Sequence, residues 1–161
     1  MAGTPAIAAV MRAGVAHRIL MYTHDPAAPA YGLEAASALG LDARQVFKTL
    51  VIALDGVERN AALAVALVPV AQQLDLKAAA DALGAKRATL ADSVLAERTT
   101  GYVVGGISPL GQRKALRTLL DESALGWAEV FISAGRRGLE IAVSPTDLLS
   151  LTLGKTARIA R

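Results

Sequence analysis

Two long apolar runs near the middle of the chain constrain its fold more than any other feature. They cover residues 47–54 and 61–68, and the short polar segment between them contains Asp55, Gly56 and Asn60. Runs of this length that are rich in apolar residues and are separated by turn-forming residues are typical of neighbouring antiparallel strands. The sequence therefore predicts an antiparallel pair of strands over these two runs.

Short helices and further strands are predicted on both sides of this pair. Capping residues, prolines and terminal glycines predict helices over residues 4–14, 31–39, 74–84, 91–97 and 144–151. Apolar or alternating segments predict strands over residues 17–23, 102–104, 117–120, 129–133 and 138–143. Strands and helices interleave without repeats or a linker. The sequence therefore predicts a single domain over residues 1–161 of the α/β (α+β) class, with a mixed, mostly antiparallel sheet flanked by short helices.

The amino-acid composition excludes several kinds of catalytic and metal-binding site, and the N-terminal sequence indicates where the protein is located. The chain has no cysteine, which excludes disulfides, thiolate metal sites and a cysteine nucleophile. Its two histidines, His17 and His24, are few for a zinc site or a histidine-based triad. The net charge of +3 permits contact with nucleic acid without requiring it. Arg12 and Gly14 interrupt the apolar N-terminus, which therefore differs from a signal peptide, and we expect a cytoplasmic protein with no membrane span.

Lys48 is the first candidate site residue, because it lies inside the first apolar run. Its neighbours Phe47, Leu50 and Val51 predict a strand that is buried on both faces. A buried ammonium group is costly unless it has a partner or a ligand, so Lys48 is a candidate for binding a phosphate or polarising a carbonyl. An exposed lysine at a strand edge, where it discourages aggregation, is the alternative interpretation.

A second candidate is the pair Gly105 and Gly106, which follows the predicted strand over residues 102–104. Glycines allow backbone N–H groups to approach a ligand closely, as the donors of an oxyanion hole do. The segment lacks the third glycine of a dinucleotide-binding loop and the Gly-Lys-Ser/Thr ending of a P-loop. A tight turn with no binding role is the alternative interpretation.

The third candidate is the segment of residues 132–140, in which Arg136 and Arg137 lie between two glycines. Arginine is suited to bidentate contacts with phosphate, so the segment is a candidate anion-binding loop. The alternative interpretation is a solvated hairpin tip.

Taken together, these segments resemble one known family, the YbaK-type aminoacyl-tRNA deacylases. These proteins are related to the editing domain inserted in bacterial prolyl-tRNA synthetases. The resemblance covers nearly the whole chain, in order and with compatible spacing, through Y-G-L-E-A-A at residues 31–36, V-F-K-T-L at 46–50, V-P-V at 68–70, T-T-G-Y-V-V-G-G-I-S-P-L-G at 99–111 and S-A-G-R-R-G-L at 133–139. Within the family the chain is most similar to the Cys-tRNA(Pro) deacylase branch.

The resemblance implies roles for individual residues. Lys48 matches the essential lysine of the family and Gly105 a functional glycine, and these two are the predicted catalytic residues. The predicted substrate-binding residues are Tyr22, Tyr31, Thr49, Gly106, Ser133, Arg137 and Glu140. Two of them depart from the family pattern, because Tyr31 stands where a phenylalanine is expected and Glu140 where an aspartate is expected.

The resemblance also implies a substrate, partners and a mechanism. It implies a proofreading enzyme that removes cysteine from the acceptor end of mischarged tRNA(Pro) and works alongside prolyl-tRNA synthetase, with no metal and no cofactor. Neither a nucleophile nor a histidine–carboxylate pair is evident in the sequence. The family's chemistry is substrate-assisted: the thiol of the cysteine attacks its own carbonyl and leaves as a thiolactone.

Three alternatives remain open on the sequence. The chain could remove alanine or another small amino acid from tRNA(Pro) with a bound water as the nucleophile. It could be a non-catalytic module that binds tRNA ends or a small ligand, although such a module has no need of Lys48 and Gly105. A general esterase is the weakest alternative, because the chain lacks an evident nucleophile.

Overall fold

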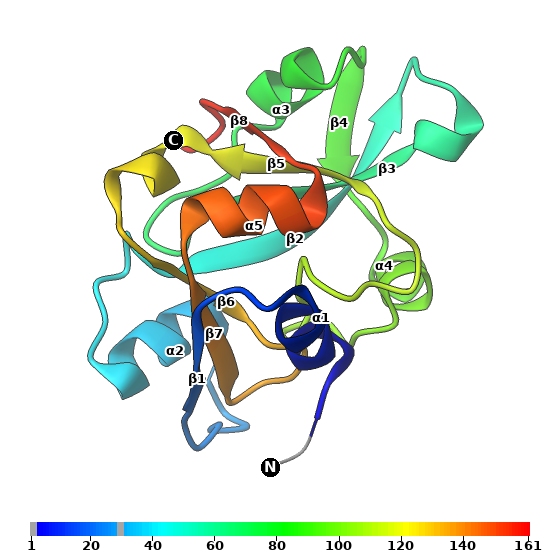
Figure 1. Cartoon of the computed structure of the whole chain (residues 1–161). Coiled ribbons are helices and arrows are strands. Elements are labelled where there is room, and N and C mark those ends of the chain that lie inside the picture. Colours follow the sequence, from blue (N-terminus) through cyan, green and yellow to red (C-terminus); the bar gives the residue numbers. More distant parts are fainter. Residues whose placement is uncertain (1–2, 29–30) are drawn as a thin grey trace.

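The computed structural model describes residues 3–28 and 31–161 (Figure 1). The helices are α1 (Pro5–Ala13), α2 (Tyr31–Leu39), α3 (Leu76–Ala82), α4 (Ser93–Thr100) and α5 (Pro145–Thr152), with short 3₁₀ turns η1 (Arg59–Ala61) and η2 (Glu122–Gly126). The strands are β1 (His17–Met21), β2 (Phe47–Asp55), β3 (Leu63–Pro69), β4 (Arg87–Leu90), β5 (Arg117–Asp121), β6 (Val130–Ser133), β7 (Leu139–Val143) and β8 (Lys155–Ala157).

The predicted antiparallel pair lies inside a five-stranded sheet with the order β4-β2-β3-β5-β8. β2 and β3 pair antiparallel, with Lys48 opposite Val68 and Ile52 opposite Ala64. β5 and β8 extend the sheet in parallel, whereas β4 pairs antiparallel with only the last four residues of β2. The first half of β2 therefore has β3 on one side and no strand of this sheet on the other.

The remaining strands form a second, three-stranded antiparallel sheet with the order β1-β7-β6. The two sheets meet where β2 begins, at a bridge between Val46 and Phe131. The N–H of Phe131 donates to the carbonyl of Gln45 there, at 3.1 Å. The mixed α/β fold and the mostly antiparallel pairing are confirmed, and the strands are divided between two sheets where the sequence predicted one.

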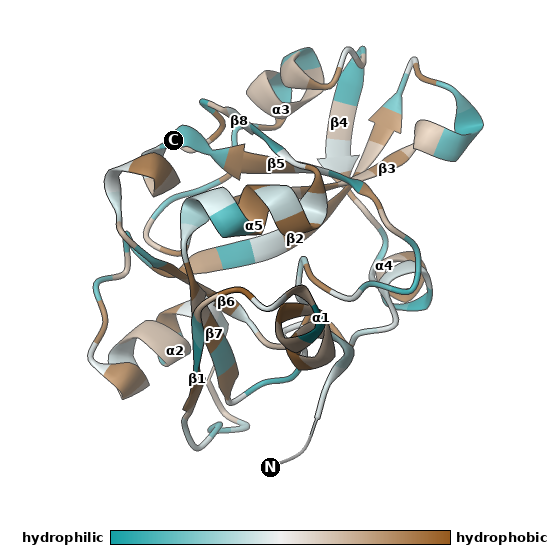
Figure 2. Cartoon of the chain, in the orientation of Figure 1, coloured by the Kyte–Doolittle hydropathy of each residue, from teal (hydrophilic) through white to brown (hydrophobic). Residues whose placement is uncertain are grey.

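Alternation along β3 separates two layers of core on the two faces of the larger sheet. Val65 and Leu67 pack into the layer that holds α1, α5 and the smaller sheet. Ala64, Ala66 and Val68 pack into the layer under α3. The apolar colours that predominate along β3 in Figure 2 reflect burial on both faces, which requires apolar residues at consecutive positions.

The predicted helix starts are confirmed at the level of individual caps. The side chains of Thr4, Asp92 and Ser144 accept hydrogen bonds from the N–H groups three residues further on, at 3.1–3.2 Å. Each bond satisfies an N–H that the helix itself leaves unpaired.

The prediction of a strand over residues 102–104 is wrong. Gly101 ends α4 in a left-handed conformation, and the Gly106 N–H donates to the Val103 carbonyl at 2.8 Å, so the chain turns at once. The Tyr102 side chain is buried and donates its hydroxyl hydrogen bond to the Leu110 carbonyl at 2.6 Å. Tyr102 therefore packs inside the loop, whereas Val103 and Val104 are exposed and pair with no strand.

No helix among residues 3–28 and 31–161 is long and apolar enough to cross a membrane.

Candidate active site

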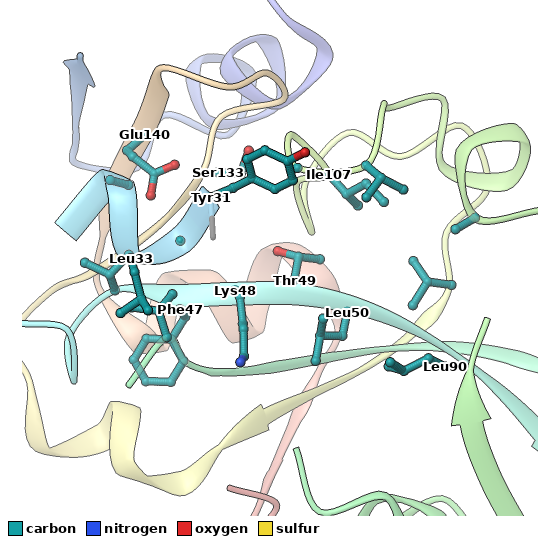
Figure 3. A pocket seen from close by; sticks show the side chains of 18 of the residues that line it. Tyr31, Leu33, Phe47, Lys48, Thr49, Leu50, Leu90, Ile107, Ser133 and Glu140 are labelled. Atoms are coloured by element: carbon teal, nitrogen blue, oxygen red, sulfur yellow. The ribbon is translucent and has the colours of Figure 1, made fainter. Parts of the chain in front are cut away.

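A pocket of about 420 Å³ lies beside the first half of β2, where β4 no longer covers the strand edge (Figure 3). The start of α2 and the segment of residues 104–107 contribute further parts of its wall, and Ser133 and Glu140 contribute from β6 and β7. The pocket therefore forms at the junction of the two sheets, from segments that lie in many parts of the sequence.

Seven of the nine predicted site residues line this pocket. They are Lys48 and Gly105, predicted as catalytic, together with Tyr22, Tyr31, Thr49, Ser133 and Glu140, predicted as substrate-binding. Gly106 and Arg137 are not part of the wall: Gly106 is buried behind the turn, and Arg137 packs on the outer side of Tyr31 and Gly105. The sequence-based reasoning missed the apolar part of the wall, which includes Leu33, Leu50, Leu90 and Ile107. No local sequence signal distinguishes these side chains from ordinary core residues.

Lys48 contributes a positively charged side chain to the pocket wall. Its side chain is half-buried, and among the described residues its amine has no salt-bridge or hydrogen-bond partner. Partial burial holds the pKa of this amine below its usual value of 10.5. An unpaired cation in such a position is suited to binding an anionic group of a ligand.

Lys48 and Thr49 point to opposite faces of β2, as consecutive strand residues must. In Figure 3 the Thr49 side chain lies on the same side of β2 as Tyr31 and Ile107, whereas the Lys48 amine points away from them. The Thr49 hydroxyl is buried without a hydrogen-bond partner in the described structure. A buried hydroxyl without a partner costs free energy, so this group is a candidate for contact with a ligand.

The backbone of Thr49 is also available to a ligand. The Val70 N–H donates to the Val46 carbonyl at 2.8 Å, which directs the backbone groups of residues 46, 48 and 50 toward β3. The alternation of an antiparallel ladder then directs the N–H and C=O of Thr49 toward the opposite edge. That edge faces the pocket and carries no strand at this position.

Glu140 supplies a buried carboxyl group to the pocket wall. It lies opposite Ser133 in the β6–β7 pair and opposite Leu20 in the β1–β7 pair, so it sits on the central strand of the smaller sheet. Only 6% of the residue is exposed, and burial raises the pKa of its carboxyl group to about 8. Burial therefore favours the neutral carboxylic acid, which can donate a hydrogen bond as well as accept one.

Tyr22 and Ser133 lie on the same wall as Glu140. Burial raises the pKa of the Tyr22 hydroxyl, and the nearby Glu140 and Glu34 act in the same direction. The Ser133 hydroxyl accepts a hydrogen bond from the Gly135 N–H at 3.2 Å, which leaves its own hydrogen free to donate toward the pocket.

The Gly105 turn closes the pocket on the side of α4. Gly105 has φ of +92°, a conformation that favours glycine. A Cβ atom at this position would lie 2.5 Å from Arg137 Nε and 2.8 Å from the Tyr31 ring. Both the backbone conformation and the packing therefore require glycine here.

A histidine–carboxylate pair is present beside the pocket, contrary to what the sequence indicated. His24 Nδ1 and Glu34 Oε1 are 2.7 Å apart, and Glu34 also accepts from the Asp25 N–H at 2.8 Å. The hydrogen bond to His24 holds the pKa of Glu34 below its usual value. Ten residues separate the two side chains, so only the fold brings them together. Neither belongs to the pocket wall, and their contacts hold His24 and Asp25 against α2.

Comparison with known proteins agrees with this geometry. Residues 26–151 match the family model described as "Aminoacyl-tRNA editing domain". Over 124 residues the chain is 40% identical to an Enterococcus faecalis protein named "Putative Cys-tRNA(Pro)/Cys-tRNA(Cys) deacylase EbsC". This alignment covers 77% of the chain and 73% of the relative.

Solved structures share the fold over the full length. A crystal structure of "a putative trans-editing enzyme for prolyl tRNA synthetase" superposes with a TM-score of 0.83 at 26% identity, covering 100% of this chain and 99% of that one. The crystal structure of hypothetical protein APE2540 superposes with a TM-score of 0.84 at 22% identity, covering 98% of this chain and all of the other, which shows the fold alone. The family match and the 40% identical relative go further than the fold, and the chain belongs to the family of aminoacyl-tRNA editing domains.

Proposed function

We propose that this protein is a trans-editing deacylase that removes cysteine from mischarged tRNA(Pro). The observation that carries the proposal is a pocket that combines the Lys48 amine, the Gly105 turn, the buried Glu140 carboxyl group and the Thr49 hydroxyl, which is buried with no hydrogen-bond partner among the described residues. A relative that is 40% identical is named for Cys-tRNA(Pro) and Cys-tRNA(Cys), which supports the choice of cysteine.

The two faces of β2 suggest how the substrate lies in the pocket. The aminoacyl ester would occupy the side of Thr49, Ser133 and Glu140, where neutral donors and acceptors gather. The terminal adenosine and its phosphate would extend toward Lys48, because this amine points to the other side of the strand. In this arrangement Lys48 binds the phosphate of the terminal nucleotide and holds the ester in place.

The proposed chemistry uses the substrate's own thiol. The sulfur of the cysteine attacks the ester carbonyl, a carbon–sulfur bond forms, and the bond between the carbonyl carbon and the ribose oxygen breaks. The thiol proton is transferred to that oxygen, so the products are a thiolactone and uncharged tRNA. Intramolecular attack of this kind reaches effective molarities on the order of 10⁵ M or more when the groups are held in place.

In this scheme the protein orients the ester and stabilises charge. The N–H groups of Gly105 and Thr49 are the candidate donors for the carbonyl oxygen, which gains negative charge as the sulfur attacks. Tyr22, Ser133 and Glu140 would position the amino acid and the ribose. Serine and alanine esters lack the thiol, so they cannot react by this route. Pocket size alone would distinguish them from the cysteine ester by only roughly 1–3 kcal/mol per methylene.

Selection of the tRNA is the part of the proposal that needs a partner. Residues 3–28 and 31–161 contain no recognisable base-reading module, so we expect prolyl-tRNA synthetase to supply discrimination between tRNA(Pro) and tRNA(Cys). Association with the synthetase would place the editing step in the cytoplasm, where mischarged tRNA is released.

The test is hydrolysis of Cys-tRNA(Pro), Ala-tRNA(Pro), Ser-tRNA(Pro) and Cys-tRNA(Cys) by the purified protein, with the products identified by mass spectrometry. Loss of cysteine from both tRNAs, with thiolactone released, is the expected result. Preferential release of free alanine would assign the chain to water-based editing instead. Binding of tRNA without deacylation of any substrate would leave only the non-catalytic alternative.

A further inference from the structure

Arg137 lies outside the pocket but is in contact with the turn that forms one wall of it. Its Nη2 donates to the carbonyl of Val104 at 2.7 Å. Its guanidinium carbon lies 4.0 Å from the centroid of the Tyr31 ring. These distances indicate a stack of Tyr31, Arg137 and Gly105, in which the guanidinium group has specific partners within the protein.

The hydrogen bond to Val104 fixes the direction of the next N–H group. Val104 C=O and Gly105 N–H belong to one peptide group, and no cis peptide bond occurs in the described residues. In a trans peptide the C=O and the N–H point in opposite directions. Since Arg137 holds the carbonyl, the Gly105 N–H points away from Arg137, and Gly105 is part of the pocket wall whereas Arg137 is not.

Of the two glycine N–H groups in the turn, only that of Gly105 remains for a ligand. The Gly106 N–H donates to the Val103 carbonyl at 2.8 Å. For the Gly105 N–H, the described residues offer no acceptor within hydrogen-bond distance. The orientation of this one peptide group therefore decides whether the turn presents a donor.

A second charged side chain holds the same residue from the other end. The Val104 N–H donates to Glu97 Oε2 at 2.8 Å, from the last turns of α4. Val104 is thus held at its N–H by a carboxylate and at its C=O by a guanidinium. Hydrogen bonds to charged groups are stronger than neutral ones, so this clamp restrains a segment that its two glycines would otherwise leave flexible.

We propose that Arg137 is a positioning residue, which orients the Gly105 N–H toward the reacting carbonyl of the substrate without binding the substrate itself. The inference rests on the proposed deacylase function. It differs from the expectation from the sequence that Arg137 binds an anion, because Nη2 donates to Val104, the guanidinium stacks on Tyr31, and Nε is buried beside Gly105 with no partner among the described residues.

The kinetic test compares Arg137→Gln and Arg137→Lys with Arg12→Gln, a control at an exposed arginine on α1 that is not part of the pocket wall. Misplacement of a catalytic group by about 1 Å costs up to about 100-fold in rate, so we expect Arg137→Gln to lower kcat about 10- to 100-fold with KM within about twofold of wild type. Arg137→Lys retains one donor but loses the planar stack, and we expect an intermediate kcat. Arg12→Gln should match wild type.

The structural test does not depend on activity. The amide resonance of Gly105 in ¹H–¹⁵N spectra should shift in both Arg137 variants and stay unchanged in Arg12→Gln. If Arg137→Gln unfolds, kcat and the Gly105 amide resonance can still be measured in Arg137→Lys. A raised KM with unchanged kcat would overturn the proposal in favour of anion binding, and an unchanged kcat with an unchanged Gly105 resonance would overturn it outright. A wild type inactive on every aminoacyl-tRNA, with Gly105 still shifted in the variants, would refute the proposed function and leave the clamp established.

Discussion

At the scale of single residues, Glu140 lies in an environment that strongly disfavours its charged form. It is buried in the smaller sheet, faces the pocket, and has no cation paired with it in the described structure. In the folded protein its pKa is about 8, compared with an ordinary value of 4.5. Because the folded state keeps a proton that the unfolded state releases, this residue couples stability to pH.

We predict that the free energy of unfolding falls as the pH rises from about 4.5 to about 8, with a contribution from Glu140 of up to about 1.4 kcal/mol per pH unit. Glu140→Gln is neutral at every pH and has nearly the same shape, so it should lose this contribution. Urea unfolding of both proteins at about pH 5, 7 and 9 measures the effect. Parallel pH profiles of the two proteins would show that Glu140 ionises normally in the folded state.

At this scale the resemblance supplied the positions of the pocket residues but not their environments. Lys48 was a candidate from the sequence alone, because burying a lysine inside an apolar run is costly unless the amine binds a partner or a ligand. Thr49, by contrast, looks like an ordinary strand residue, and its buried, unpartnered hydroxyl depends on where β4 ends along β2. That is a property of the fold which the residues near Thr49 do not encode.

At the scale of secondary structure elements, the Gly105 turn matters most for the site. Its left-handed conformation is shared with several other glycines, among them Gly84 after α3, where φ is +69° and a Cβ atom would have no neighbour within 4 Å. At Gly105 the same atom would collide with Arg137 and Tyr31. The two positions therefore differ in packing and not in the sign of φ.

We expect Gly84→Ala to cost about 1–2 kcal/mol of stability through the left-handed conformation alone, with full deacylase activity. Gly105→Ala carries the same conformational cost and also displaces Arg137 from Val104. It should therefore lower the deacylation rate by at least about 10-fold. Urea unfolding and single-turnover kinetics on both variants separate the two effects. Equal activity of the two variants would mean that the packing around Gly105 has no role in catalysis.

Helices that begin at a capping residue could be predicted from the sequence, whereas short strands that depend on a distant partner strand could not. Thr4, Asp92 and Ser144 each cap a helix by accepting a hydrogen bond from an N–H three residues further on. Because this contact is local, the type of the capping residue is enough to predict where the helix begins. β4 and β8 have only four and three residues, and they become strands because β2 and β5 offer edges to pair with. Residues 102–104 have strand-like composition and no such edge.

At the scale of the whole molecule, one core layer connects the two sheets. Phe47 and Val51 from the larger sheet pack in the same buried cluster as Ile132 and Ile141 from the smaller sheet. The pocket lies at this junction, so its geometry depends on both sheets being in place. The division into two sheets was not predicted, because sequence patterns locate strands but do not show which strands are neighbours.

We therefore propose that residues 1–161 unfold as one domain. Circular dichroism in the far ultraviolet and fluorescence of Trp127, which packs at the edge of the shared cluster, should give coincident urea transitions. Two separate transitions would indicate that the sheets are independent units.

The central claim is that the pocket around Lys48 deacylates Cys-tRNA(Pro), and single-turnover kinetics of Lys48→Ala test it most directly. Lys77→Ala is the matched control, because Lys77 is an exposed lysine on α3 that is not part of the pocket wall. We predict that Lys48→Ala lowers the rate about 100-fold or more through lost positioning, while Lys77→Ala retains the wild-type rate and both variants remain folded. Full activity of folded Lys48→Ala would contradict the account, because the pocket would then not be the site of the reaction.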